Sequence, residues 1–110
     1  MANNTQINAT SYYQLPCGRF LEDFIYYKGL NFNMGSAVKY CWRAGNKDGE
    51  SESKDLKKAD HYIVFEAKCS GYAEQKVRAY VNALIKEAKK WDGNPDHLDP
   101  LLSLKFFGVR

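Results

Sequence analysis

The sequence lacks the features that would place the protein in a membrane. No run approaches the about 18 consecutive apolar residues that suggest a membrane-spanning helix. Residues 1–10 are polar and contain no apolar core of a secretory signal peptide. We therefore expect a cytoplasmic protein with no membrane contact.

Cysteine is also scarce, with three residues at positions 17, 41 and 69. Their odd number and wide spacing match no zinc motif, and the ordinary role of Cys41 is that of a buried free thiol. Asp96, His97 and Asp99 have the composition of metal ligands, but they follow a proline in a loop-like segment. We predict no metal site.

Motifs for phosphoryl chemistry are missing as well. The chain has no Gly-x-x-x-x-Gly-Lys-Ser/Thr sequence, the loop with which P-loop kinases bind phosphates. It also lacks the Glu-x-x-Glu and Glu-x-x-x-Asp motifs with which helical nucleotide pyrophosphohydrolases hold magnesium. The helix predicted to begin at Ser53 offers only Asp55, Asp60 and Glu66. These absences favour phosphate binding over phosphate chemistry.

The residues that are present describe one small folded domain. The chain of 110 residues is 45% hydrophobic and 15% aromatic, with eight tyrosines and two tryptophans. Such amphipathic rings are favoured at interfaces and as stacking surfaces. The net charge of +3 is too mild to imply nonspecific binding to duplex DNA, although a small anion needs only a local basic patch.

Hydrophobic periodicity predicts a mainly α-helical fold, a small bundle of about four helices. We place the helices at residues 19–28, at 33–45 between an Asn33 cap and a left-handed Gly45, from a Ser53 cap through residue 67, and at about 72–91. The inward stripes are Leu56, Ala59, Ile63 and Ala67 on the third helix, and Val77, Tyr80, Val81, Leu84, Ala88 and Trp91 on the fourth. We expect residues 1–10 to form a mobile tail, 11–95 the helical domain with an extended N-terminal segment, and 96–110 an apolar arm that packs on the core or on another subunit.

The helix at residues 33–45 carries an unusual polar face. Ser36, Lys39, Tyr40 and Arg43 share one side, opposite an apolar stripe of Met34, Ala37, Val38, Cys41 and Ala44. A solvated face usually pairs its bases with acids, and this face has none. It suits a flat, anionic ligand, with Lys39 and Arg43 contacting phosphate. The alternative is an ordinary solvated face.

Neighbouring residues extend this candidate site. Lys47 follows the helix in a loop, and the amide of Asn33 can cap the helix or contact a ligand. Trp42 is a ligand contact, a core residue or a subunit-contact residue. Tyr12 and Tyr13 either close over the ligand as a lid that stacks on a base, or pin the N-terminus to the core.

Part of the chain resembles a family of small bacteriophage proteins described as of unknown function or as nucleotide kinases, after a nucleoside monophosphate kinase of T7-type phages that lacks a P-loop. The resemblance is carried by Tyr13-Gln14, by Leu30-Asn31-Phe32-Asn33-x-Gly35-x-Ala37-Val38-Lys39-Tyr40-x-Trp42-Arg43-Ala44-Gly45-x-Lys47, and by Asp55-Leu56-x-Lys58-Ala59-x-x-Tyr62. Where that family begins with His-Tyr, this chain has Tyr12-Tyr13. The resemblance implies a phage protein in the host bacterial cytoplasm, with Lys39, Arg43, Lys47 and Lys58 as phosphate contacts and Tyr13, Tyr40 and Trp42 as aromatic contacts.

Three functions remain open at this stage. The first is a non-catalytic protein that sequesters a host nucleotide signal, such as a cyclic dinucleotide of antiphage defence, without a cofactor. The second is a nucleoside monophosphate kinase that uses ATP and magnesium. The third is a structural or host-protein-binding module. The many aromatic residues and the apolar tail also predict a symmetric homo-oligomer, a dimer or tetramer.

Overall fold

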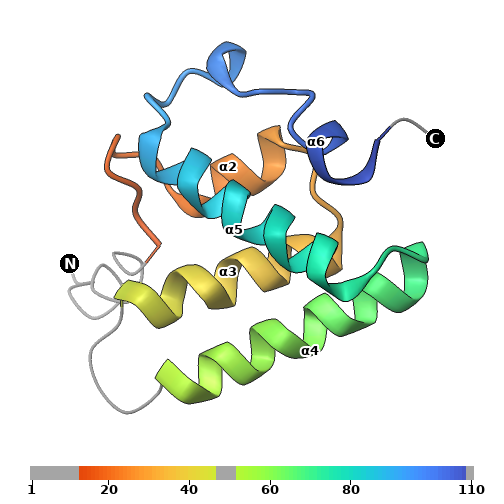
Figure 1. Ribbon diagram of the computed structural model, residues 1–110. Helices are drawn as coiled ribbons and strands as arrows, with labels where there is room; N and C mark the ends of the chain where they lie inside the picture. Colours follow the sequence, from red (N-terminus) through yellow and green to blue (C-terminus); the bar gives the residue numbers. More distant parts are fainter. Residues whose placement is uncertain (1–12, 47–51, 109–110) are drawn as a thin grey trace.

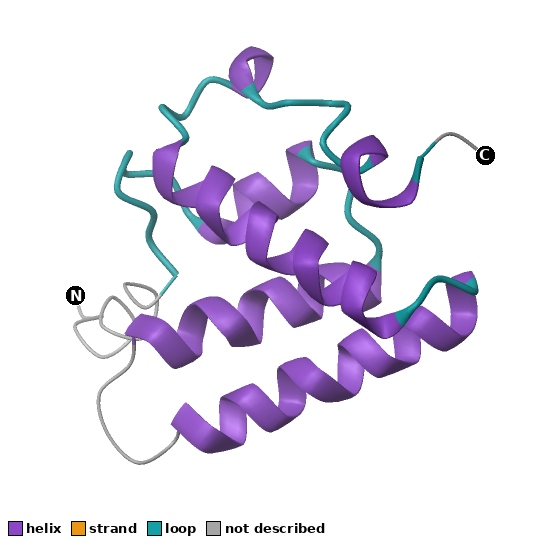
Figure 2. Ribbon diagram, viewed as in Figure 1, coloured by secondary structure: helices purple, strands orange, loops and turns teal. Residues whose placement is uncertain are grey.

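The computed structural model describes residues 13–46 and 52–108, which are mainly helical (Figure 1, Figure 2). The elements are α2 (Leu21–Tyr27), α3 (Phe32–Asn46), α4 (Glu52–Ser70), α5 (Glu74–Lys90), the 3₁₀ turn η1 (Pro95–His97) and α6 (Leu104–Phe107). In these two ranges the only strand-like pairing is an isolated bridge between Gln14 and Phe20. The predicted mainly helical fold is therefore confirmed. The expected tail at residues 1–10 lies outside the described residues.

The helices surround one core. Helices α3 and α4 run antiparallel side by side, and α5 crosses over them and packs against both (Figure 1). The stripe predicted on α5 is buried at every position, from Val77 to Trp91. Side chains from α2, α3 and α4 complete the core, among them Phe24, Val38 and Ile63. Within the described residues, no helix is both long enough and apolar enough to cross a bilayer.

The predicted stop at Gly29 is confirmed by the geometry at the end of α2. Gly29 has a φ of +66°, a conformation that residues with a Cβ rarely adopt. Its N–H donates to the carbonyl of Tyr26 at 3.0 Å, and the N–H of Leu30 donates to the carbonyl of Ile25 at 3.2 Å. This pair of bonds is a Schellman motif, which turns the chain sharply into α3.

The start and the end of α3 differ from the predicted ones. Asn31, rather than Asn33, caps the helix, because its Oδ1 accepts the N–H of Met34 at 2.8 Å. Both asparagines precede apolar residues at helical spacing, so periodicity alone cannot separate them. At the other end α3 continues through Gly45 to Asn46, so the predicted left-handed stop at Gly45 is wrong.

Replacing the cap should weaken the fold measurably. We expect Asn31→Ala to lower the free energy of unfolding by about 1 kcal/mol, because the N–H of Met34 loses its acceptor. Asn33→Ala is a matched control, since both amides donate to Glu66 but only Asn31 caps the helix. Urea unfolding curves would measure the difference. An equal or larger loss in Asn33→Ala would contradict the assignment.

The first turn of α4 also departs from the prediction. The helix begins at Glu52, so Ser53 lies inside it and is not its cap. Ala59, Ile63 and Ala67 are buried as expected, but Leu56 is 48% exposed and Asp55 is only 2% exposed. The buried stripe of α4 therefore includes the carboxylate of Asp55 in place of Leu56. Asp55 can be buried because it faces the guanidinium of Arg43 on α3.

The C-terminal arm folds back on α5 of the same chain. Phe107 lies 4.3 Å from Tyr72 and 5.3 Å from Tyr80 between ring centroids, and Leu98 is buried. Two of its apolar side chains, Leu101 and Leu104, stay exposed. We expected the arm to pack either on the core of its own chain or on another subunit. In the structure it packs on the core of its own chain.

Candidate functional site

The polar face of α3 lies against α4, and together they form one surface, which we call the α3–α4 face. We define it by Tyr13, Lys39, Tyr40, Arg43, Lys58 and Tyr62. The rings of Tyr40 and Tyr62 are stacked across the two helices, with centroids 6.0 Å apart and an interplanar angle of 4°. Two ammonium groups flank this pair, since Lys39 Nζ lies 5.5 Å and Lys58 Nζ 5.3 Å from the Tyr40 ring centroid.

Both lysines are available to an anion. They are exposed, and in the described part of the chain neither forms an ion pair with a carboxylate. Lys39 also lies over the ring of Tyr13, at 5.7 Å from its centroid. All three distances fall within the roughly 6 Å range of cation–π attraction, which orients a lysine without neutralising its charge. The site is therefore a pair of oriented cations beside a flat aromatic surface.

Arg43 has two protein partners of its own. Its Nε lies 3.4 Å from Oδ2 of Asp55, and its Nη1 donates a hydrogen bond of 3.0 Å to the hydroxyl of Tyr13. The bond to Tyr13 and the charge of Asp55 raise the pKa of the guanidinium above its usual value. A phosphate would have to compete with these partners. Arg43 therefore joins α3, α4 and the N-terminal segment, while its direct contact with phosphate stays a prediction.

Tyr13 is held at both ends. Its carbonyl accepts the N–H of Leu21 at 2.7 Å, its hydroxyl accepts from Arg43, and its half-buried ring packs against the core. These contacts are those of the anchoring role, one of the two that the sequence left open. Tyr12 and Lys47 were also predicted to contact the ligand, and both lie outside the described residues.

Three other predicted site residues do not contribute to the arrangement around the two lysines. Trp42 is 4% exposed and belongs to the hydrophobic core, so its ring does not line the α3–α4 face. Asn33 directs its amide to Glu66, at 3.4 Å. Ser36 is half-buried on the same side of α3 as Tyr40. The predicted residues that the structure brings together are Tyr13, Lys39, Tyr40, Arg43 and Lys58.

Sequence reasoning missed two members of this arrangement. Tyr62, the stacking partner of Tyr40, lies one helical turn after Lys58, so an aromatic residue at that spacing was an available signal. The sequence placed Asp55 in the first turn of the predicted third helix and gave it no partner. Only the antiparallel packing of α3 and α4 brings its carboxylate to Arg43.

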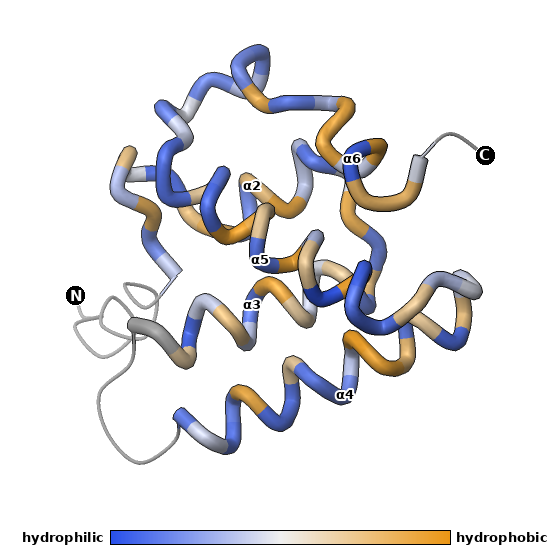
Figure 3. The backbone as a smooth tube through the Cα atoms, in the orientation of Figure 1, coloured by the Kyte–Doolittle hydropathy of each residue, from blue (hydrophilic) through white to orange (hydrophobic). Residues whose placement is uncertain are grey.

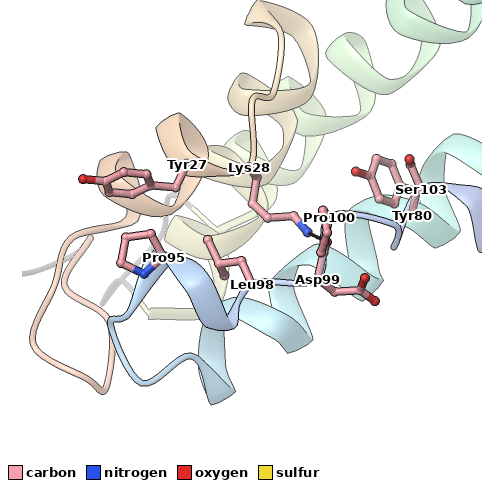
Figure 4. Close-up of a pocket in the computed structure, with 8 residues that line it drawn as sticks. All are labelled: Tyr27, Lys28, Tyr80, Pro95, Leu98, Asp99, Pro100 and Ser103. Atoms are coloured by element: carbon pink, nitrogen blue, oxygen red, sulfur yellow. Dashed lines mark hydrogen bonds between the residues drawn. The ribbon is translucent and has the colours of Figure 1, made fainter.

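A second polar centre lies beneath the C-terminal arm. Lys28 is only 5% exposed, and its ammonium forms an ion pair of 2.8 Å with Glu87 and donates to the carbonyl of Asp99. Lys28, Tyr80 and Ser103 line two cavities, of about 220 and 290 Å³. Figure 4 shows the smaller of the two. Burial raises the pKa of Tyr80, and Glu87 adds to the shift. Because Lys28 is already neutralised by Glu87, this centre is less suited to an anion than the α3–α4 face.

The loop after α5 contains a pair of contacting polar side chains, Asp92 and His97. His97 Nδ1 contacts Asp92 Oδ2, and Asp92 also accepts the N–H of Asn94 at 2.9 Å. The bonds from Asn94 and His97 lower the pKa of Asp92 below its usual value. Within the described residues, no group of three His, Cys, Asp or Glu side chains is placed to hold a metal ion.

Comparison with known proteins links the chain to one family. Residues 9–64, slightly more than half of the chain, match the family model of a protein of unknown function, DUF3310. The chain belongs to the DUF3310 family. The DUF3310 match contains every residue of the α3–α4 face, and it ends before α5 and the arm begin. Searches of curated proteins and of solved structures gave no match.

Proposed function

We propose that this protein binds an anionic nucleotide on the α3–α4 face and holds it without converting it. The observation that carries the proposal is the placement of two exposed ammonium groups on one tyrosine, with Tyr62 stacked beside it. Neither ammonium pairs with a carboxylate of residues 13–46 or 52–108. Cations bind phosphate through charge-assisted hydrogen bonds, and aromatic rings stack on bases of any identity. A nucleotide is the small ligand that combines both groups.

The arrangement favours binding over phosphoryl transfer. A kinase must place two nucleotides and a metal-bridged phosphate in line. Two acids of α4 are already engaged, since Asp55 pairs with Arg43 and Asp60 with Arg78, at 3.4 and 2.7 Å. Neither carboxylate is directed at a phosphate that Lys39 and Lys58 would hold. We therefore rank the nucleoside monophosphate kinase second.

The resemblance to small phage proteins gives this binding a biological setting. A phage protein that captures a nucleotide signal of host defence, such as a cyclic dinucleotide, needs affinity and no turnover. Its site needs cations for the phosphates and rings for the bases, the two groups that Lys39, Lys58, Tyr40 and Tyr62 supply. We propose sequestration of such a signal in the host bacterial cytoplasm as the role of the protein, with a homo-oligomer still a prediction.

Neutralising the two lysines tests the binding site. We expect Lys39→Gln and Lys58→Gln each to weaken nucleotide binding by about 10- to 150-fold, the equivalent of losing one charge-assisted hydrogen bond. Lys86→Gln, an exposed lysine on α5, is the matched control and should bind normally. Calorimetric titration of nucleoside mono-, di- and triphosphates and cyclic dinucleotides would measure these affinities.

The same ligands, incubated with the protein and separated afterwards, distinguish the two leading functions. Recovery of unchanged ligand supports sequestration. Release of ADP from ATP and a nucleoside monophosphate would establish the kinase instead. Undiminished binding by the Lys39→Gln, Lys58→Gln double variant would place the ligand elsewhere on the molecule.

A further inference from the structure

The aromatic surface continues past the site of a single nucleotide. From Tyr62 the rings run on to Phe32, 5.7 Å away, and to His61, 5.1 Å away, and His61 stacks on Phe65 at 6.2 Å and 7°. Phe32 is 75% exposed and Phe65 is 49% exposed. Rings this exposed contribute little to the core. They continue the aromatic surface of Tyr40 and Tyr62, although Phe32 and His61 meet the Tyr62 ring edge-on, at 78° and 79°.

Unneutralised lysines accompany these rings. Lys54, Lys57, Lys58 and Lys68 are exposed along α4, and Figure 3 shows this helix as hydrophilic over most of its length. None of them forms an ion pair with a carboxylate of the described residues. Lys39 joins them from α3.

The acids of α4 are turned away from this surface or bound. Asp55 pairs with Arg43 and Asp60 with Arg78, while Glu66 accepts from the amides of Asn31 and Asn33 at 3.2 and 3.4 Å. Glu52, in the first turn, is the exception. The outer side of α4 therefore carries more positive charge than its composition indicates.

The length of this surface sets the size of the ligand. Residues 54–68 span roughly 21 Å along the helix axis at about 1.5 Å per residue. The two lysines at Tyr40 occupy only one part of that length. A mononucleotide bound there would leave His61, Phe65 and Lys68 without a ligand contact.

From these features we infer that the ligand is a short single-stranded oligonucleotide, which lies along α4 with bases on the rings and phosphates on the lysines. The inference rests on the proposed nucleotide-binding function and names its ligand class. Single-strand binding proteins combine the same two elements, a basic track and a row of stacking rings, with little dependence on sequence.

A second copy of this chain fits the surface less well. In a two-fold dimer the same patch meets itself, so the lysines of one copy would face the lysines of the other. Like charges placed opposite each other oppose association. A phosphate backbone has the complementary charge.

Fluorescence anisotropy with labelled thymidine ligands of increasing length tests the inference. We expect affinity to rise by about tenfold with each added base that stacks, from thymidine monophosphate towards an eight-residue oligothymidylate. Salt should weaken binding of the oligothymidylate, with a log–log slope of about −0.7 for each phosphate neutralised, up to roughly −3.5 for five lysines. Lys57→Gln should reduce the slope by about 0.7.

Two pairs of variants locate the ligand. Phe65→Ala should weaken binding of the oligothymidylate by fivefold or more and leave binding of thymidine monophosphate unaffected. The control Tyr26→Ala removes a more exposed ring from α2, 77% against 49%, and should change neither affinity. Lys57→Gln and Lys86→Gln form the corresponding lysine pair. These substitutions alter exposed side chains, so the fold should persist.

The possible outcomes distinguish a failure of the oligonucleotide inference from a failure of the proposed nucleotide-binding function. Mononucleotide binding with no gain from length would overturn the inference and leave the proposed function in place. Failure of every nucleotide to bind would overturn both. Self-association that Phe65→Ala abolishes, with oligothymidylate affinity unchanged, would reassign this surface to contact between copies of the chain.

Discussion

Arg43→Met should lower the free energy of unfolding by about 2–3 kcal/mol, and the melting temperature by roughly 10 °C. The substitution removes the cation that the carboxylate of Asp55 faces, at 3.4 Å, while Asp55 remains only 2% exposed. Breaking a fully buried pair costs about 3–5 kcal/mol, and the 32% exposure of the Arg43 side chain places this pair below that range. The hydrogen bond to Tyr13 is lost as well.

Arg78 provides the matched control. It pairs with Asp60 at 2.7 Å, but both side chains are about half exposed. Exposed ion pairs contribute about 0–1 kcal/mol, so Arg78→Met should change stability little. Urea unfolding of both variants measures the two losses, and equal losses would show that the burial of Asp55 has no energetic weight.

A double variant separates the charge from the packing. Arg43→Met, Asp55→Leu removes both charges and should recover much of the stability, because apolar residues of similar volume can replace a buried pair without loss. A double variant less stable than Arg43→Met alone would mean that Asp55 stabilises the protein mainly through other contacts.

The second large effect is expected at Lys28. Lys28→Met should cost about 2–4 kcal/mol, because it leaves Glu87 without its partner at 2.8 Å and frees the carbonyl of Asp99. Glu87 also accepts the N–H of Asp99 at 2.7 Å, so this one cluster joins the end of α2, the middle of α5 and the arm. We expect the arm to loosen before the helices unfold.

Hydrogen exchange shows whether the loss is local. In Lys28→Met the amides of residues 98–107 should exchange faster than in the wild type, while those of α3 and α4 keep most of their protection. Lys86→Met, an exposed lysine on the same helix as Glu87, should leave both regions unchanged. Uniform loss of protection would show that the cluster supports the whole fold and not the arm in particular.

The fold was predictable where periodicity is strong. The stripe of α5 from Val77 to Trp91 repeats over the whole helix and identifies both the element and its buried face. At the first turn of α4 the same reasoning chose Leu56 over Asp55. An analysis of hydrophobic periodicity predicts that an acidic residue faces solvent. An acidic side chain can be buried when a neighbouring helix supplies a cation to pair with it, and the periodicity of one helix does not show this.

The candidate site was also predictable only in part. Lys39 and Tyr40 share a face of one helix, so spacing predicts their proximity, and Lys58 was included through the family resemblance. The stacking of Tyr62 on Tyr40 and the two partners of Arg43 arise from contacts between separate elements. Helical spacing contains no information about such contacts, which depend on the register in which α3 and α4 pair.

The burial of the α5 stripe also bears on how the family can vary. The DUF3310 match ends at residue 64, yet Val38 and Ile63 within it share a core with Val77, Val81 and Leu84 beyond it. The inner face of the matched segment is therefore covered by apolar side chains that lie outside the match. The α3–α4 face, where we propose that the ligand binds, lies on the other side of the α3–α4 pair from the covering helix α5. The cover can accordingly diverge in sequence and length as long as it stays apolar, while the other side remains free to evolve for binding.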